Sequence, residues 1–199
     1  MEKRMTKQKQ MLPAIVDTFT ALDPACAILL VGSVQHGYER PGSDIDIIAI
    51  VHDTIQTDPA QWQVRWEHRG VKSLTGNEGG VELCVFFAPI SAFERWLTET
   101  PHHMYPFSRG EILHDPEGLA GRYQAVARGY FEAHPAIAEE WEAQLQAHKQ
   151  VKLTGRDENG CYRTAEGHLR KYLTLDAFAA HMSELAKREI DENKIQPGP

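Results

Sequence analysis

Two aspartates at the start of an apolar run are the residues whose spacing most directly indicates chemistry. Asp44 and Asp46 alternate with isoleucines in a run that continues to Val51, which predicts a buried β-strand beginning at Ile45. Because side chains alternate along a strand, both carboxylates fall on one side while the isoleucines enter the core. Neighbouring carboxylates repel each other unless water or a cation lies between them, and their hard oxygen atoms favour Mg²⁺.

A Gly-Ser pair ends the preceding apolar run and adds a second chemical signal. Gly32 and Ser33 follow the run Ala27–Val31, and ten residues separate them from Asp44. Glycine lets a ligand come against the backbone, and serine offers a hydroxyl and an N–H group. If a helical turn starts at Ser33, its free amides point outward, so this segment indicates an anion site.

One lone carboxylate near the beginning of a third apolar run follows the same logic. Glu82 lies in the run Val81–Ala88, where a charge is costly unless it is paired or bound to a metal. If this strand lies beside the strand of residues 45–51, Glu82 joins Asp44 and Asp46. Three carboxylates can hold two metal ions for an in-line attack on a phosphorus centre.

These residues together resemble a known family of enzymes. The order Gly-Ser, ten residues, Asp-Ile-Asp and then a glutamate inside an apolar strand resembles the DNA polymerase β nucleotidyltransferase superfamily. The spacing is similar to that of the minimal and the aminoglycoside nucleotidyltransferases. The resemblance covers residues 28–88 and includes the Arg-Pro-Gly-Ser segment at positions 40–43. Residues 110–118 resemble, less specifically, the segment after the catalytic domain in stand-alone bacterial members.

The resemblance implies a role for each residue of the motif. Gly32 and Ser33 would hold the β- and γ-phosphates of a nucleoside triphosphate. Asp44 and Asp46 would bind two Mg²⁺ ions. Glu82 would complete the site of the ion that activates the hydroxyl of the acceptor.

Four further residues are candidates with weaker signals. Arg40 and Ser43, in the segment that leads into the aspartates, are candidate nucleotide-binding residues, and a purely surface role for Arg40 is an equal alternative. The sequence does not place a general base, for which Glu111 and Glu117 are candidates.

The resemblance implies a metal-dependent transfer of a nucleoside monophosphate to a hydroxyl group. We expect AMP from ATP, or another nucleoside monophosphate from its triphosphate, to move to a small-molecule acceptor with release of pyrophosphate. Protein AMPylation by an antitoxin-type nucleotidyltransferase and a non-catalytic nucleotide- or partner-binding module remain alternatives. A Mn²⁺-dependent glycosyltransferase would use the Asp-x-Asp motif but leaves Gly32 and Ser33 unexplained.

Composition and charge limit the classes of partner that the protein can bind and indicate its cellular compartment. The chain has 199 residues, 42% of them hydrophobic and 25% charged, with a formal net charge of −7. This is ordinary globular composition, and the acidic balance disfavours a protein that mainly holds a nucleic-acid backbone. No apolar run approaches the roughly 18–20 residues of a membrane span, and the basic start leads into no apolar segment typical of a secretory signal. Three widely spaced cysteines indicate reduced thiols in a cytoplasmic protein.

Hydrophobic periodicity predicts an α/β front and a helical back. The front is expected to hold a helix at 7–22, strands at 27–31, 45–51, 61–72 and 81–88, a turn at 75–80, a helix at 89–98, an irregular segment at 101–109 that includes a His102-His103 loop pair, and an edge strand at 111–114. Cys84 is expected to be a small buried hydrophobe.

The back is expected to be helical. Asp115 caps a helix that starts at Pro116, a second helix follows Pro135, and a third covers about 161–190. A linker is expected at 155–160 and a frayed tail at 194–199. The predicted fold class is α/β (α+β), a polymerase-β-like mixed sheet with flanking helices in a nucleotidyltransferase domain of residues 1–115. A helical hairpin or bundle of residues 116–199 follows, with apolar stripes that need the sheet or a second copy of the chain, as in a homodimer, to pack against.

Overall fold

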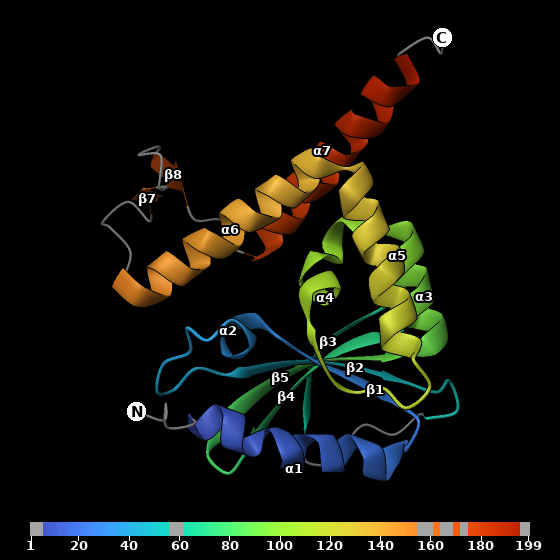
Figure 1. Cartoon of the computed structure of the whole chain (residues 1–199), viewed down its shortest axis with the longest axis vertical. Coiled ribbons are helices and arrows are strands. Elements are labelled where there is room, and N and C mark those ends of the chain that lie inside the picture. The colour runs from blue at the N-terminus through green and yellow to red at the C-terminus, as the bar shows by residue number, and fades with distance from the viewer. Residues whose placement is uncertain (1–5, 56–61, 155–160, 164–168, 172–174, 196–199) are drawn as a thin grey trace. The chain divides into compact units, whose positions relative to one another are not determined.

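Figure 1 shows the computed structural model of the chain, which describes residues 6–55, 62–154, 161–163, 169–171 and 175–195. The chain divides into two compact units. The sheet unit consists of residues 1–99 and 106–126, and the helical unit of residues 100–105 and 127–199. Helix α5 (Leu119–Ala133) begins in the sheet unit and ends in the helical unit. The domain boundary predicted after residue 115 stays a prediction.

A mixed sheet organises the first unit, and its described part has six strands. They are β1 (Ala27–Val31), β2 (Ile45–Val51), β3 (Gln63–His68), β4 (Val71–Glu78), β5 (Val81–Pro89) and β6 (Glu111–His114), in the spatial order β3-β4-β5-β2-β1-β6. Strands β2 and β5 run parallel, and the other neighbours run antiparallel. The predicted fold class is confirmed, and so are the strands at 27–31, 45–51 and 81–88 and the edge strand at 111–114.

Helix α1 (Lys7–Leu22) covers one face of this sheet, as Figure 1 shows. Its bounds equal the predicted ones, and Ile15 and Phe19 lie fully buried against the sheet. The sheet contributes alternate residues of its central strands, such as Ile47 and Val85. Each fully buried aliphatic or aromatic side chain of this kind is worth about 1.5–3 kcal/mol. The α1 face is therefore the main core, and the alternate residues of β2 and β5 face the other way.

The other face of the sheet carries α3 (Ile90–Glu99), α4 (Tyr105–Arg109) and the first part of α5. The ring of Phe93 contacts the rings of Phe107 and Tyr123 at centroid distances of 4.8 and 5.5 Å. The buried Gln124 donates from Nε2 to the carbonyl oxygens of Phe107 and Gly110 at 2.9 and 2.8 Å. These contacts fix α5 to the segment that leads into the edge strand β6.

The hairpin β3–β4 corrects two predictions. The segment 61–72 is not one strand, because Arg69 and Gly70 both have positive φ and form a two-residue turn between the strands. Such turns favour Asn-Gly or Gly-Gly, so arginine gave no signal. The expected turn at 75–80 is β4 as far as Glu78 and turns only at Gly79 and Gly80. Gly76 lies inside the strand, where a Cβ would come 2.8 Å from the Trp62 ring.

Three further predictions were partly wrong. Residues 101–109 are not irregular but form a 3-10 turn, η1 (Pro101–His103), followed by α4. The helix expected from Pro116 starts at Leu119, and Asp115 caps it across a turn by accepting from the N–H groups of Ala120 and Gly121. The helix expected over 161–190 is replaced by β7 (Cys161–Arg163), β8 (Leu169–Lys171) and α7 (Leu175–Ile195). The predicted linker at 155–160 and residues 196–199 of the predicted tail lie outside the described residues.

The helical unit packs aromatic side chains between η1, α6 (Pro135–Thr154) and α7. Trp141 of α6 contacts the ring of Phe178 edge-on at a centroid distance of 4.7 Å and donates from Nε1 to the carbonyl of His102 at 2.6 Å. Tyr105 contacts Phe131 at a centroid distance of 4.9 Å. Among the helices that the structure describes, none has the apolar length that a bilayer crossing requires.

Candidate functional site

The turn between β1 and α2 (Gly32–Gln35) is where two of the predicted site residues meet. Gly32 has a φ of +72°, and a Cβ built on it would lie 2.1 Å from Asp46 Oδ2. The carboxylate of Asp46 thus occupies the space that any side chain at position 32 would need. The helical turn that an anion site requires is present and begins one residue before Ser33, with the His36 N–H donating to the Gly32 carbonyl at 3.2 Å.

Strand β2 orients the two aspartates as the alternation predicts. Ile45 and Ile47 are fully buried on the α1 face, so Asp44 and Asp46 belong to the opposite face. Both aspartates are half-buried. Asp46 pairs with Val31 of β1, directly before the Gly32 turn.

The parallel pairing of β2 and β5 brings the third predicted acid to the same face. Ile45 pairs with Leu83 and Asp46 with Cys84, so continuing the register by one residue sets Glu82 beside Asp44. Glu82 is exposed. Across the described ranges, no group of three His, Cys, Asp or Glu side chains is close enough to hold one metal ion. The positions are therefore adjacent along the sheet, and the convergence of the three carboxylates on shared ions stays a prediction.

Cys84 lies beside Asp46 on the same face of the sheet, which the sequence did not predict. It is half-buried, and its pKa is raised to about 11 by burial and by the charges of Asp46 and Asp44. A hydrogen bond with Ser73 opposes this shift only in part. The thiol is therefore protonated near neutral pH and borders the aspartates, and Cys84 is only half-buried instead of being the small buried hydrophobe expected. Its spacing of two from Glu82 was the available signal, but the register with Asp46 follows only from the strand pairing.

The loop that leads into the aspartates is held by its own turn and by helix α1. The Arg40 N–H donates to Ser43 Oγ, and the Ser43 N–H donates to the Arg40 carbonyl, each at 2.9 Å. The buried Gln8 donates from Nε2 to the carbonyl oxygens of Arg40 and Ser43, at 2.9 and 3.1 Å. The Thr6 hydroxyl donates to the Glu39 carboxylate at 2.9 Å. The Ser43 hydroxyl and the Arg40 backbone thus shape the loop, whereas the Arg40 residue is exposed. Gln8 and Thr6 are site-supporting residues for which the sequence offered no signal.

A cavity of about 380 Å³ opens between the first turn of α1, the loop at 39–43 and residues 80–82. Its size falls in the range of small-molecule sites, roughly 300–1,000 Å³. The lining includes two cations, Lys7 and Arg40, and two carboxylates, Glu39 and Glu82. Of the seven predicted site residues, Arg40, Ser43 and Glu82 line this cavity, and Gly32, Ser33, Asp44 and Asp46 do not. Ser33 is fully buried, so its hydroxyl has no contact with solvent in the structure.

One candidate general base lies at the wrong end of the sheet. Glu117 Oε2 is 4.0 Å from His52 Nε2, and His52 directly follows the far end of β2. Asp46 is the second residue of that strand, so about 20 Å of extended chain separates it from His52. Glu117 therefore cannot take a proton at the aspartates. Glu111 pairs with Leu30, near the Gly32 turn, and remains a candidate.

Known proteins resemble this chain in structure rather than in sequence. No family model matches the sequence, and no curated protein matches it. The solved structures that resemble part of this chain include a nucleotidyltransferase-like protein and several terminal uridylyl transferases. A nucleotidyltransferase-like protein from Exiguobacterium sibiricum is 12% identical, with 74% of this chain and 49% of that chain covered and a TM-score of 0.41. A cytoplasmic RNA terminal U-transferase is 14% identical over 52% of this chain and 36% of its own, with a TM-score of 0.34.

A third similar structure is terminal uridylyl transferase 4 from Trypanosoma brucei with bound UPU. It is 14% identical over 53% of this chain and 44% of its own, with a TM-score of 0.31. The chain thus spans about half or less of the length of the proteins it matches. These similarities concern part of the fold, and they say nothing about the substrate or the acceptor of this chain.

Proposed function

We propose that this protein is a metal-dependent nucleotidyltransferase that moves AMP from ATP to a hydroxyl group of a small-molecule acceptor and releases pyrophosphate. The observation that supports this proposal is the close approach of Gly32 to Asp46, 2.1 Å from a notional Cβ to Oδ2. A glycine turn that lets phosphates approach the backbone stands directly against a carboxylate suited to a divalent cation. Neither the glycine turn nor the carboxylate alone would indicate nucleotidyl transfer. Because they are adjacent, a phosphate at the turn and a cation on the carboxylate would lie next to each other.

The donor set fits Mg²⁺, because the residues on this face offer carboxylate oxygens. Asp44 and Asp46 would hold the ions, and Glu82, one register step away, would close the set. When bound, Mg²⁺ lowers the pKa of the acceptor hydroxyl and neutralises charge on the triphosphate. The backbone at Gly32 and Ser33 and the side chain of Arg40 would position the phosphates, while the hydrogen-bonded turn at Ser43 keeps the loop in place.

The proposed reaction is a single displacement at phosphorus. The acceptor oxygen forms a bond to the α-phosphorus, and the bond from this phosphorus to the oxygen bridging to the β-phosphate breaks. Pyrophosphate leaves with that electron pair, and the hydroxyl proton passes to water. The chain contributes position and fixed charge rather than a covalent intermediate.

The charge of the chain favours a cationic small molecule, such as an amino sugar, as the acceptor. The net charge is −7, and the start of α6 carries Glu139, Glu140 and Glu142. An acidic protein attracts cationic ligands and repels a phosphate backbone. RNA and protein are therefore tested as alternative acceptors.

The test incubates the full chain with Mg²⁺, each α-labelled nucleoside triphosphate and a panel of aminoglycosides, RNA oligonucleotides and the chain itself. We expect a mass increase of one AMP on a small-molecule hydroxyl, with pyrophosphate formed in equal amount. D46N should abolish this transfer, whereas D17N, which neutralises an exposed acid on α1, should preserve it. Transfer that survives D46N, or labelling of RNA or protein only, would contradict the proposal.

A further inference from the structure

An arginine lies beside the Gly32 turn, on the side away from the aspartates. Strand β1 ends at this turn and has β2 on one side and β6 on the other. On the β2 side, the carboxylate of Asp46 stands against Gly32. On the β6 side, Leu30 pairs with Glu111 in an antiparallel register, and two more steps of that register set Arg109, the last residue of α4, beside Gly32. A carboxylate and a cationic residue therefore flank the turn.

Two contacts support this placement of Arg109. Its carbonyl oxygen accepts from Gln35 Nε2 at 2.7 Å, and Gln35 is the last residue of α2, the helical turn that begins at Gly32. A Cβ built on Gly110 would lie 3.1 Å from Val31 Cγ1 and 3.3 Å from a backbone oxygen of β1. The chain that follows Arg109 thus passes directly against the end of β1.

The backbone around Arg109 is held on two sides, while Arg109 itself is exposed. The Gln35 side chain holds its carbonyl on the β1 side. On the α5 side, Gln124 donates to the carbonyls of Phe107 and Gly110 at 2.9 and 2.8 Å, and the Gly110 N–H donates to the Phe107 carbonyl at 3.0 Å. A side chain on a fixed backbone loses less conformational freedom when it binds a ligand than one on a mobile loop does.

The proposed reaction needs a cationic side chain at this turn. Its predicted metal ligands are all carboxylates, the chain carries a net charge of −7, and the triphosphate is itself an anion. Arg40, the cation assigned to the phosphates so far, lines a cavity that Gly32 does not line. A guanidinium group stays charged at physiological pH and can bind two phosphate oxygens at once. Arg109 has this chemistry and lies next to the turn.

We propose that Arg109 binds the β- and γ-phosphates of the nucleoside triphosphate at the Gly32 turn, on the side opposite Asp46. This inference rests on the proposed nucleotidyl transfer and adds a binding residue to it. When the bond between the α-phosphorus and the bridging oxygen breaks, the negative charge that develops falls on the departing pyrophosphate. A cation fixed beside the β- and γ-phosphates stabilises that charge.

The test titrates the full chain calorimetrically, in Mg²⁺, with an ATP analogue that resists cleavage between the α- and β-phosphates, with inorganic tripolyphosphate and with AMP. R109Q should weaken binding of the analogue and of tripolyphosphate by about 10–100-fold, the factor expected when a charged hydrogen bond is lost. The affinity for AMP should not change, because AMP lacks the β- and γ-phosphates. R109K keeps the charge but not the planar fork, so its affinities should fall between those of R109Q and the wild type.

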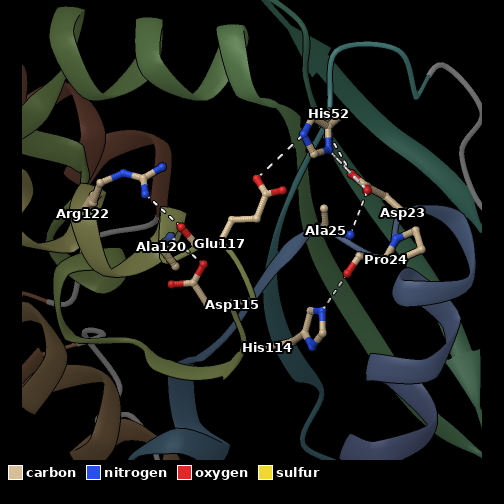
Figure 2. A network of polar contacts seen from close by, with 9 residues as sticks. All are labelled: Asp23, Pro24, Ala25, His52, His114, Asp115, Glu117, Ala120 and Arg122. Atoms are coloured by element: carbon tan, nitrogen blue, oxygen red, sulfur yellow. Dashed lines mark hydrogen bonds and ion pairs between the residues drawn. The ribbon is translucent and has the colours of Figure 1, made fainter.

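The matched control is R122Q, which removes another exposed arginine of the sheet unit. As Figure 2 shows, Arg122 lies beside Glu117, whose carbonyl accepts from Arg122 Nη1 at 2.9 Å, and Glu117 is near the far end of β2. R122Q should bind all three ligands as the wild type does. Without ligand, R109Q should melt at the wild-type temperature, because the bond from Gln35 reaches the backbone of residue 109 and not its side chain.

The outcomes separate this contact from the reaction. If R109Q binds the triphosphate analogue as the wild type does, or loses affinity for AMP and the analogue equally, the phosphate contact is overturned and the reaction is not. If R122Q weakens binding as much as R109Q does, the effect is one of net charge and the contact is again overturned. A wild-type chain that binds tripolyphosphate through Arg109 but transfers no nucleotide supports the contact and overturns the proposed reaction.

Discussion

Gly32 and Gly37 share a left-handed backbone, with φ of +72° and +71°, but differ in what surrounds them. A Cβ at Gly32 collides with the Asp46 carboxylate, whereas a Cβ at Gly37 meets nothing within 4 Å. Alanine at either position costs about 1–2 kcal/mol for the backbone conformation. We therefore expect G32A to lower the free energy of unfolding by more than G37A does.

The same pair separates folding from ligand binding. G37A should keep the rise in melting temperature that Mg²⁺ and ATP produce, because its site geometry is unchanged. G32A should lose that rise, since Asp46 can no longer keep its place. Chemical denaturation and thermal melts with and without Mg·ATP measure both effects. Equal losses in the two variants would mean that the contact with Asp46 is not what position 32 provides.

Asp23 makes the stability of the sheet unit depend on pH at the acid end of the range. Its pKa is raised by burial but lowered, on balance, by hydrogen bonds from His52 and Ala25. A group with a depressed folded pKa stabilises the fold above its unfolded pKa, about 3.9, and this stability is lost as the pH falls further. D23N should cost about 1–3 kcal/mol at pH 7 and flatten the decline below pH 4. Urea unfolding at pH 3–7 tests this, with D17N as the surface control.

At the scale of elements, the contact of η1 with α7 carries a second pH dependence. Burial and the neighbouring His103 lower the pKa of His102 to about 4, and the residue is 9% exposed. The unfolded chain takes up this proton near pH 6.5, so stability is present above that pH and is lost as the pH falls toward 4. The difference amounts to roughly 3 kcal/mol at most.

H102Q should remove most of this dependence, because an amide can keep a hydrogen bond with Ser183 without taking up a proton. Circular dichroism of helix unfolding between pH 4 and 8 measures the effect. H181Q, at an exposed position of α7, is the control and should unfold with the wild-type pH profile. A wild-type profile in H102Q would assign the acid sensitivity to another group.

Elements with local signals were predicted, and elements fixed by distant contacts were not. The isoleucine-rich β2 is recognisable as a nearly continuous apolar run, and the amphipathic α1 because every third to fourth residue is apolar. Gly76 reads as a turn residue by itself, and only the Trp62 ring packed against it explains why it lies in a strand. For the same reason, the sequence predicted only conditionally that Glu82 and Asp46 share a face, because this depends on β5 pairing parallel to β2.

At the scale of the molecule, the sheet unit needs the beginning of α5. A variant that ends at residue 115 removes Gln124, which satisfies the carbonyls of Phe107 and Gly110, and Tyr123, which packs on Phe93. Each lost hydrogen bond costs about 0.5–1.5 kcal/mol, and the Phe107 carbonyl keeps the Gly110 N–H as its donor at 3.0 Å. We expect this variant to be insoluble and a variant ending at residue 133 to keep its Mg·ATP-dependent melting shift. Expression yield and thermal melts compare the two.

A further substitution controls for the residues of the helical unit that the truncation leaves behind. The variant ending at residue 133 still exposes Met104 and Tyr105, which are buried in the full chain, so it should aggregate more than the full chain does. Replacing Tyr105 with serine in that variant should restore solubility without changing nucleotide binding. If the variant ending at residue 115 behaves as well as the one ending at 133, α5 does not support the sheet through Gln124 and Tyr123.

The chain crosses between its two units three times, and this has a consequence for synthesis. Residues 100–105 belong to the helical unit but emerge from the ribosome between two parts of the sheet unit. His103 cannot reach its partner carbonyl at Ala179 until 76 further residues exist, which takes roughly 4–15 s at about 5–20 residues per second. For that interval Met104 and Tyr105, which are buried in the full chain, wait for the rest of their unit to be made, so folding of the helical unit must be completed after synthesis of the sheet unit.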